Sequence, residues 1–445
     1  MKLRIVPAWL LSPALPAAGL LYGLLFCLAI AHLMGWMWPP LATKIFYGAL
    51  FSWVGVLAWR SRPLPRSPVL ADKLFGLFVL GVLVSLLAHG RADSSAMKHL
   101  QFVPSLVVLP YIIGRIMTPG DARLLVRVLV WAGPLILLLA IFDYYQSRET
   151  MTAGPRWIFF GTDHSPLLIS FMLSASLIAS TFMLFMQHRT AWRQAALLVV
   201  QGISVVSLVF VAARGVLLGA MLGMVFMMFA TRGVPVVRRV GFLMYLSAVL
   251  IFAFFVLPNP QSELYAKLMT DPNIAYQTSF AEAPNFGADT AVSGATPILG
   301  EAACSPFKEG QNSISMRWVL YKEAVAVFLG APWGGVGAAL FGRHSCAGVG
   351  GYPHSTILQS FAELGAAGGL LFVGLMAWTM ASLLRAGRTK HWMLPLVLGM
   401  AVQYLATDQF YGNYLMAAGT YFWVGMTASM QSNSEESPLH GNENA

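Results

Sequence analysis

The segment from Pro332 to Leu371 reads PWGGVGAALFGRHSCAGVGGYPHSTILQSFAELGAAGGLL. Its first part is a polar, glycine-rich loop that ends at Tyr352 and Pro353. His354 follows, and the chain then enters a long apolar helix that contains Glu363. A histidine at the mouth of a membrane helix, preceded by a flexible glycine loop, predicts a site at the membrane surface.

Composition places the chain in a membrane. Of its 445 residues, 57% are hydrophobic and only 10% are charged, whereas soluble domains carry about 25% charged residues. Apolar runs of about 20 residues recur along the whole length. The net charge of +10 fits the basic loops that orient membrane proteins. No basic patch with interleaved aromatic residues is present, so we expect no nucleic-acid partner.

Hydrophobic runs predict an all-α polytopic membrane protein with about twelve transmembrane helices. The apolar run that begins after the basic N-terminus is interpreted as an uncleaved first span. The predicted spans are 16–35, 41–59, 70–89, 97–116, 122–142, 165–187, 194–211, 214–230, 237–257, 354–384, 391–407 and 412–430.

The run from Ala195 to Ala230 is too long for a single span. As one helix it would measure about 54 Å, against a hydrocarbon core of about 30 Å. We therefore predict two spans with a tight turn near Arg214. With the N-terminus inside, this split gathers most arginines and lysines of the short loops on the inner face, as the positive-inside rule requires. Merging the two spans would move the basic residues that follow them to the outside.

This topology divides the chain into four parts. Residues 1–257 form helices 1–9, residues 258–353 form one large outer loop with short helices near 261–270 and 313–329, and residues 354–430 form helices 10–12. Residues 431–445 form a polar tail inside the cell, predicted to be disordered. A loop of this length is usually functional.

Two arginines and one histidine are the main catalytic candidates. Arg214 is flanked by apolar residues at the outer face, where positive charge is disfavoured, and an ionisable residue in such a place suggests function. Arg317 lies in the amphipathic piece of the outer loop. Both offer a planar fork for phosphate or carboxylate. At a helix N-terminus His354 should stay neutral near pH 7 and be free to accept a proton.

Glu363, Asp408 and His164 are weaker candidates for substrate binding. Ser355, Gln359 and Glu363 are spaced four apart and share one helix face, which should point into the protein. For Glu363, pairing with an arginine from another span is favoured over a catalytic role. Asp408 could orient His354 or pair with an arginine, although a solvated carboxylate is the simpler interpretation. His164, at the outer end of a span, has similar standing.

Cysteines and missing motifs add two expectations. If the large loop faces an oxidising compartment, Cys304 and Cys346 can form a disulfide worth roughly 3–4 kcal/mol. The chain has no Asp-x-Asp motif, no zinc-type cysteine and histidine spacing and no Walker A loop. We therefore expect no metal site, no nucleotide site and no cofactor.

These residues resemble the O-antigen ligase and polymerase superfamily of bacterial envelope glycosyltransferases. The resemblance rests on AARG around Arg214, on the stretch from Arg317 to Gly337, and on PHSTILQSFAELGAAGGLL from Pro353 to Leu371. Its hallmark is a histidine at a helix start, followed by a leucine-rich turn, a glutamate and Gly-x-x-Gly. It covers roughly residues 200–375.

The resemblance implies a GT-C-type enzyme of the bacterial inner membrane with its site facing the periplasm. Its partners would be membrane lipids, a donor glycan on undecaprenyl pyrophosphate and a lipid A–core acceptor. His354 would act as the base in an inverting, metal-independent transfer, while Arg214 and Arg317 hold the pyrophosphate. One long loop favours a ligase. The alternatives are an O-antigen polymerase or protein O-oligosaccharyltransferase and, outside enzymes, an exporter or flippase of a lipid-linked saccharide, which would place polar residues near the bilayer midplane.

Overall fold

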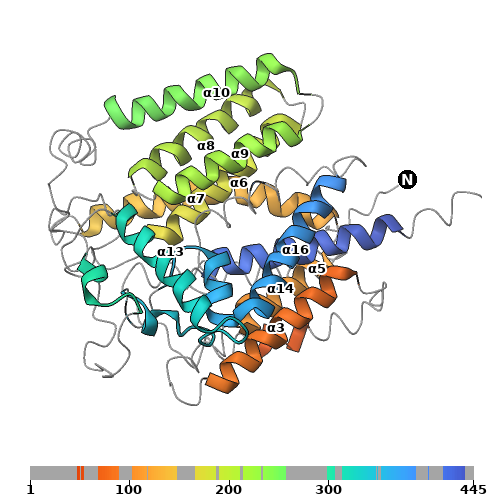
Figure 1. Cartoon of the computed structure of the whole chain (residues 1–445). Coiled ribbons are helices and arrows are strands. Elements are labelled where there is room, and N and C mark those ends of the chain that lie inside the picture. The colour runs from red at the N-terminus through yellow and green to blue at the C-terminus, as the bar shows by residue number, and fades with distance from the viewer. Residues whose placement is uncertain are drawn as a thin grey trace, which may run out of the picture.

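The computed structural model is all-helical in the part of the chain that it describes (Figure 1). That part comprises residues 48–50, 52–54, 69–89, 103–117, 119–147, 166–186, 190–210, 214–231, 234–256, 298–305, 313–346, 348, 352–386, 399 and 414–435. The elements before residue 257 are α3 (Leu70–His89), the π-helical η3 (Val103–Val108), α5 (Leu109–Ile116), α6 (Pro119–Ser147), α7 (Pro166–Met186), α8 (Ala191–Phe210), α9 (Arg214–Ala230), α10 (Val236–Ile251) and the π-helical η4 (Phe252–Val256). The later ones are the 3-10 turn η5 (Glu301–Cys304), α13 (Ser313–Gly330), the 3-10 turn η6 (Phe341–His344), α14 (Thr356–Ala386) and α16 (Tyr414–Glu435).

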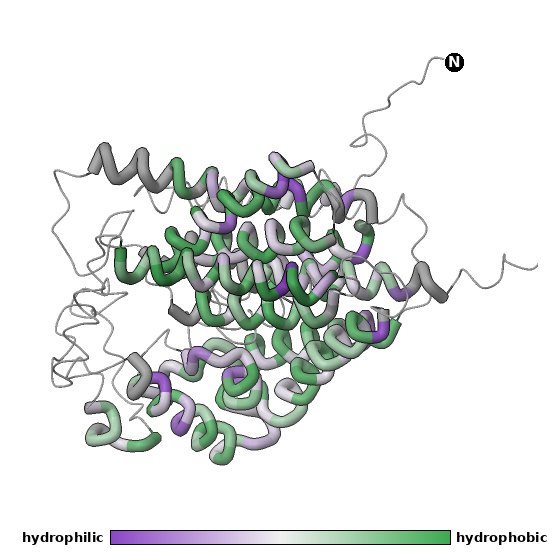
Figure 2. Tube along the Cα trace, turned by 90° about the horizontal axis from the view of Figure 1, so that it is seen from above, coloured by the Kyte–Doolittle hydropathy of each residue, from purple (hydrophilic) through white to green (hydrophobic). Residues whose placement is uncertain are grey.

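Four of the described helices are long and apolar enough to cross a membrane, namely Leu70–His89, Ala191–Val209, Val236–Val256 and Thr356–Arg385. Hydrophobic residues predominate along the tube in Figure 2, and hydrophilic ones occupy short stretches. The chain is therefore a helical membrane protein. The predicted span 16–35 lies outside the described residues, as do most of 41–59, nearly all of 391–407 and the predicted short helix 261–270.

Helix boundaries agree closely with the hydrophobic runs at several places. The spans predicted at 70–89 and 214–230 coincide with α3 and α9, and the predicted loop helix 313–329 is α13. The run around Arg214 contains two helices, because α8 ends at Phe210 and α9 begins at Arg214. The predicted span 97–116 differs, since its described part is the π-helical η3 followed by α5. α16 continues to Glu435, beyond the predicted end of its span at residue 430.

Close helix packing relies on glycines where two backbones meet. A side chain at Gly114 of α5 would collide with the backbone of Phe422, and one at Gly425 of α16 with that of Tyr111. Small residues of this kind let helices approach closely in a membrane, where packing rather than water exclusion drives association. α5 and α16 thus form one tight pair in the core.

A buried ion pair joins α3 to α5. Arg115 donates from Nε to Oδ1 of Asp72 at 3.1 Å and from Nη2 to Oδ2 at 3.2 Å, and the Tyr111 hydroxyl donates to Oδ1 at 2.6 Å. The two-pronged geometry satisfies both carboxylate oxygens. This pair joins the first turn of α3 to the last turn of α5, at the end of α3 opposite to His89.

Candidate active site

α14 is not one continuous helix, because it breaks at Gly365. That residue has φ 68° and ψ −169°, values outside the helical region. The broken turn leaves backbone groups without helical partners, and a loop at residues 331–340 supplies them. Ala366 donates its N–H to the Pro332 carbonyl, while Val336 and Gly337 donate to the carbonyls of Ala362 and Glu363. The glycine-rich loop therefore docks directly into the break.

Glycine is required at the two points of closest approach. A Cβ on Gly365 would collide with the carbonyl of Trp333, and a Cβ on Gly335 would collide with the backbone of Glu363. Both glycines also have positive φ, 68° and 67°, which other residues adopt at a cost. This docking role of Gly365 was not predicted from the sequence.

Glu363 holds the same loop through its side chain. The carboxylate is 1% exposed and accepts hydrogen bonds from the N–H of Ala339 at 2.9 Å, from Nε2 of Gln359 at 3.1 Å and from the backbone of Phe341. Among the described residues, the partners of the Glu363 carboxylate are these backbone and amide N–H groups, and the predicted arginine partner stays a prediction. Backbone amides reach the carboxylate because the loop turns its N–H groups toward the helix, with Ala339 in the left-handed region at φ 63°.

His354 stands just ahead of α14. The sequence placed it in the first turn of the helix, but α14 begins at Thr356, and His354 has φ 52°. Such a left-handed, non-glycine backbone costs about 1–3 kcal/mol and clusters at functional sites. The ring packs on Tyr352, with centroids 4.2 Å apart.

Arg317 of α13 lies close enough to His354 to act on it electrostatically. Burial and the positive charge of Arg317 lower the pKa of His354 from 6.5 to about 4. The imidazole is therefore neutral at pH 7. Burial and a neighbouring cation are the cause, and neither was part of the argument from the sequence. The helix N-terminus supplied the sequence argument, yet His354 lies before that helix.

The remaining predicted site residues are placed only in part. Arg214 is the first residue of α9, and its side chain lies outside the described residues. His164 and Asp408 also lie outside them. The structure thus brings Arg317 within electrostatic reach of His354 and places the Glu363 carboxylate against the 331–340 loop.

A disulfide pins the loop between α13 and α14. The two cysteines singled out in the sequence, Cys304 and Cys346, are bonded to one another, with Cα atoms 5.2 Å apart. The nearby backbone N–H of Ile298 donates to the carbonyl of His344. The bridge joins the short η5 turn to Cys346, which lies two residues after η6 and six residues before Tyr352.

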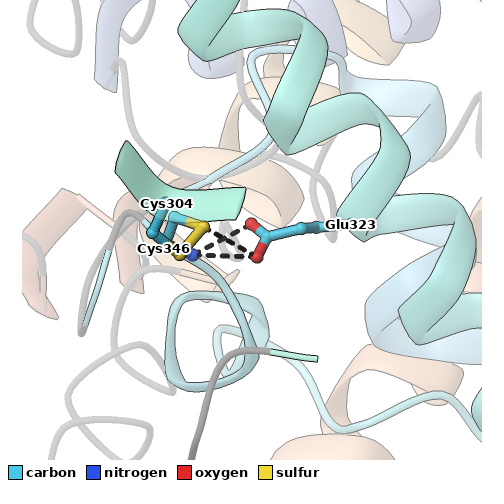
Figure 3. Close-up of side chains that lie close together, drawn as sticks. All are labelled: Cys304, Glu323 and Cys346. Carbon is cyan, nitrogen blue, oxygen red and sulfur yellow. Dashed lines mark hydrogen bonds between the residues drawn. A yellow bond between two sulfur atoms is a disulfide. The ribbon is translucent and has the colours of Figure 1, made fainter. Parts of the chain in front are cut away.

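Glu323 was missed by the sequence reasoning and lies beside this disulfide (Figure 3). Its fully buried carboxylate accepts two hydrogen bonds from the N–H of Cys346, at 2.9 and 3.1 Å, and Oε1 lies 3.0 Å from Cys346 Sγ. A disulfide sulfur carries no proton, so a hydrogen bond across that contact needs the proton on Glu323. Burial raises the pKa of Glu323, against the opposing effect of the Cys346 N–H. Because the sulfurs are bonded together, this cluster offers no thiolates to a metal.

Comparison with known families supplies the context for this arrangement. Residues 199–373 match the family model described as O-antigen ligase. Over this central range the chain is similar to the O-antigen ligase family. The matched range contains Arg214, Arg317, His354 and Glu363, and it agrees with the resemblance drawn from the sequence. No curated protein matches the chain significantly.

The family match supplies a general chemical context. Members of the O-antigen ligase superfamily are glycosyltransferase-like ligases and polymerases. The family in general implies lipid-linked glycan and lipid A–core substrates. The apolar helices of this chain agree with a membrane enzyme of that kind.

Proposed function

We propose that this protein is an O-antigen ligase of the bacterial inner membrane. It transfers a polysaccharide from undecaprenyl pyrophosphate to a hydroxyl of lipid A–core oligosaccharide at the periplasmic face. The observation that carries the proposal is the pairing of a neutral, strained His354 with Arg317, inside the range matched by the family model.

The proposed chemistry divides base and anion binding between the two residues. The acceptor hydroxyl needs a proton acceptor as it attacks the anomeric carbon, and neutral His354 can serve. The leaving lipid pyrophosphate needs its charge held, for which Arg317 and Arg214 are suited. One displacement inverts the anomeric centre, and we propose that no metal ion takes part.

Anion binding also tunes the base. A pKa of about 4 makes His354 a weak base in the free protein. A bound pyrophosphate beside Arg317 would offset the guanidinium charge and raise the pKa of the imidazole, since opposite charge favours the protonated form. On this proposal the donor prepares the base for the reaction.

The test compares donor binding with ligation in purified variants. His354→Ala should lower turnover by about 10²–10⁴-fold and largely keep binding of the undecaprenyl-pyrophosphate donor. Arg317→Ala and Arg214→Ala should weaken both, and Arg214→Lys should restore activity only in part because an ammonium lacks the two-pronged geometry. Full ligation by His354→Ala would remove it as the base.

Two further outcomes decide the rest of the proposal. Unchanged donor affinity in both arginine variants would remove the pyrophosphate clamp. Activity lost with EDTA and restored by a divalent ion would overturn metal independence. To separate ligase from polymerase, a null strain is examined for lipopolysaccharide: polymerised chains that stay on the lipid carrier, with the core uncapped, identify a ligase.

A further inference from the structure

α13 carries an exposed apolar stripe on the side opposite its core contacts. Trp318 is 61% exposed, Val325 45% and Leu329 68%, and Trp333 just beyond the helix is 82% exposed. The helical members are spaced seven and four apart and therefore share one face. Lys322 lies on the same face, with its Nζ 5.9 Å from the Trp318 ring centroid.

The opposite face of α13 is already satisfied by the protein. Met316, Leu320, Ala324 and Val327 are buried there, and Phe328 makes an edge-to-face contact with Phe361 of α14 at 5.4 Å. An exposed apolar stripe on an otherwise packed helix indicates a surface that meets something other than water.

Two helix lengths locate the C-terminal end of α13 at a membrane surface. α3 has 20 residues, about 30 Å, which matches the hydrocarbon core. Its last turn meets the loop that follows α13, because Ala338 donates its N–H to Ser85 Oγ at 2.9 Å and Gly337 adjoins His89. The part of α14 after the break at Gly365, residues 366–386, measures about 31 Å. The C-terminal end of α3 and the N-terminal end of this part of α14 therefore lie at the level of this loop.

α13 itself does not span. It carries Arg317, Lys322 and Glu323 within 18 residues and is not among the helices apolar enough to cross. In Figure 1 it runs crosswise to α8, α9 and α10, as expected of a helix that lies along a surface. The lipid-facing side of α3 leads toward it, since Val84 and Leu87 near the outer end of α3 are also exposed.

We propose that α13 is an interfacial helix whose Trp318–Val325–Leu329–Trp333 face is embedded in the bilayer. Tryptophan and lysine are typical of the headgroup level, and amphipathic helices bury their apolar face about 5–10 Å into the headgroup and acyl boundary. The consequence is positional: Arg317, one residue from Trp318, is held at the level of lipid phosphates, where a lipid-linked pyrophosphate lies. The proposed membrane contact does not depend on the ligase assignment. The role of Arg317 beside a lipid-linked pyrophosphate does rest on that assignment.

Spin labels at single cysteines test the contact in the full-length protein. Cys27→Ser removes the thiol outside the disulfide, and Val325→Cys and Leu329→Cys then take the label. Val240→Cys on α10, exposed on a candidate span, is the lipid reference, and Thr190→Cys between α7 and α8 is the aqueous one. The protein is reconstituted in phosphatidylethanolamine and phosphatidylglycerol vesicles, and collisions with oxygen and with a water-soluble nickel chelate are compared by electron paramagnetic resonance.

We expect both labels to collide with oxygen more than with nickel, at ratios between the two references. A ratio equal to that of Thr190→Cys would overturn the proposal. So would spin–spin broadening that disappears on dilution with unlabelled protein, which would assign the stripe to a second copy. Lipid contact that appears only after donor is added would assign it to the donor's prenyl chain. Each readout is independent of ligation, so failure of the ligase assignment would be seen separately.

Discussion

At the scale of single residues, the site depends on a histidine whose surroundings disfavour its protonated form. Burial and Arg317 lower the pKa of His354 to about 4, and its backbone has φ 52°. Both features cost stability, and proteins keep such costs mainly where function requires them. Glu363 and Glu323 show the contrasting case, because their buried carboxylates accept hydrogen bonds that hold loops in place.

The lowered pKa of His354 predicts a pH-dependent stability. The unfolded chain takes up a proton near pH 6.5, whereas folded His354 does so only near 4, so stability should fall as the pH drops through that window. His354→Asn tolerates the left-handed backbone and removes the titration. Between pH 7.5 and 4.5, the unfolding temperature of the native protein in detergent should fall further than that of the variant. Parallel curves would contradict the assigned pKa.

At the scale of elements, the broken helix α14 organises the site. The break at Gly365 opens backbone groups to which the 331–340 loop binds, and the half-helix before the break carries Gln359 and Glu363. The loop in turn connects α13, which bears Arg317, with the disulfide and His354. Local strain and backbone pairing therefore position two side chains that are distant in sequence.

A methyl group at the break should disrupt this element. Gly365→Ala places a Cβ against the Trp333 carbonyl at a positive φ, which should cost roughly 1–3 kcal/mol or more and reduce ligation. Gly374→Ala is the matched control, because it lies in the same helix with open space around it and alanine is the better helix former. Thermal unfolding of both variants is compared; equal stability would show that the break tolerates a side chain.

The disulfide is the second device at this scale. Cys304→Ser combined with Cys346→Ser should lower stability by roughly 3–4 kcal/mol on the chain-entropy model, since the bridge closes a separation of 42 residues. Cys27→Ser serves as the control that changes a cysteine outside the bridge. Unfolding by denaturant without reductant gives the measurement. A double variant as stable as the control would mean that Glu323 and the neighbouring contacts already fix the loop.

At the scale of the whole molecule, the two helices α8 and α9 determine the orientation of all that follows. If both cross the membrane, reporters fused after residues 190 and 235 lie in the same inner compartment, and one fused after residue 300 lies outside. Alkaline phosphatase and green fluorescent protein fusions measure this, because the first is active only outside the cytoplasm and the second fluoresces only inside. If the reporters after 190 and 235 lay in opposite compartments, α8 and α9 together would cross the membrane only once, and the proposed site would face the cytoplasm.

The sequence by itself determined the class of protein and indicated the residues that we propose for the site. Hydrophobic runs of span length, charge asymmetry and the His354 to Gly368 motif are local patterns, so α3, α9 and α13 could be predicted nearly to the residue. The cysteine pair could be named because the chain has only three cysteines and two of them lie in the one long polar loop.

Only the tertiary structure decided how these residues are used. The break at Gly365 depends on a loop docking from 30 residues earlier, and no helical period reveals it. Glu363 pairs with backbone amides, Glu323 lies against the disulfide, and Asp72 meets Arg115 across 43 positions, because backbone turns and helix contacts bring them together. The pKa of His354 likewise depends on Arg317, whose position is set by the packing of α13 against α14 and not by any local sequence pattern.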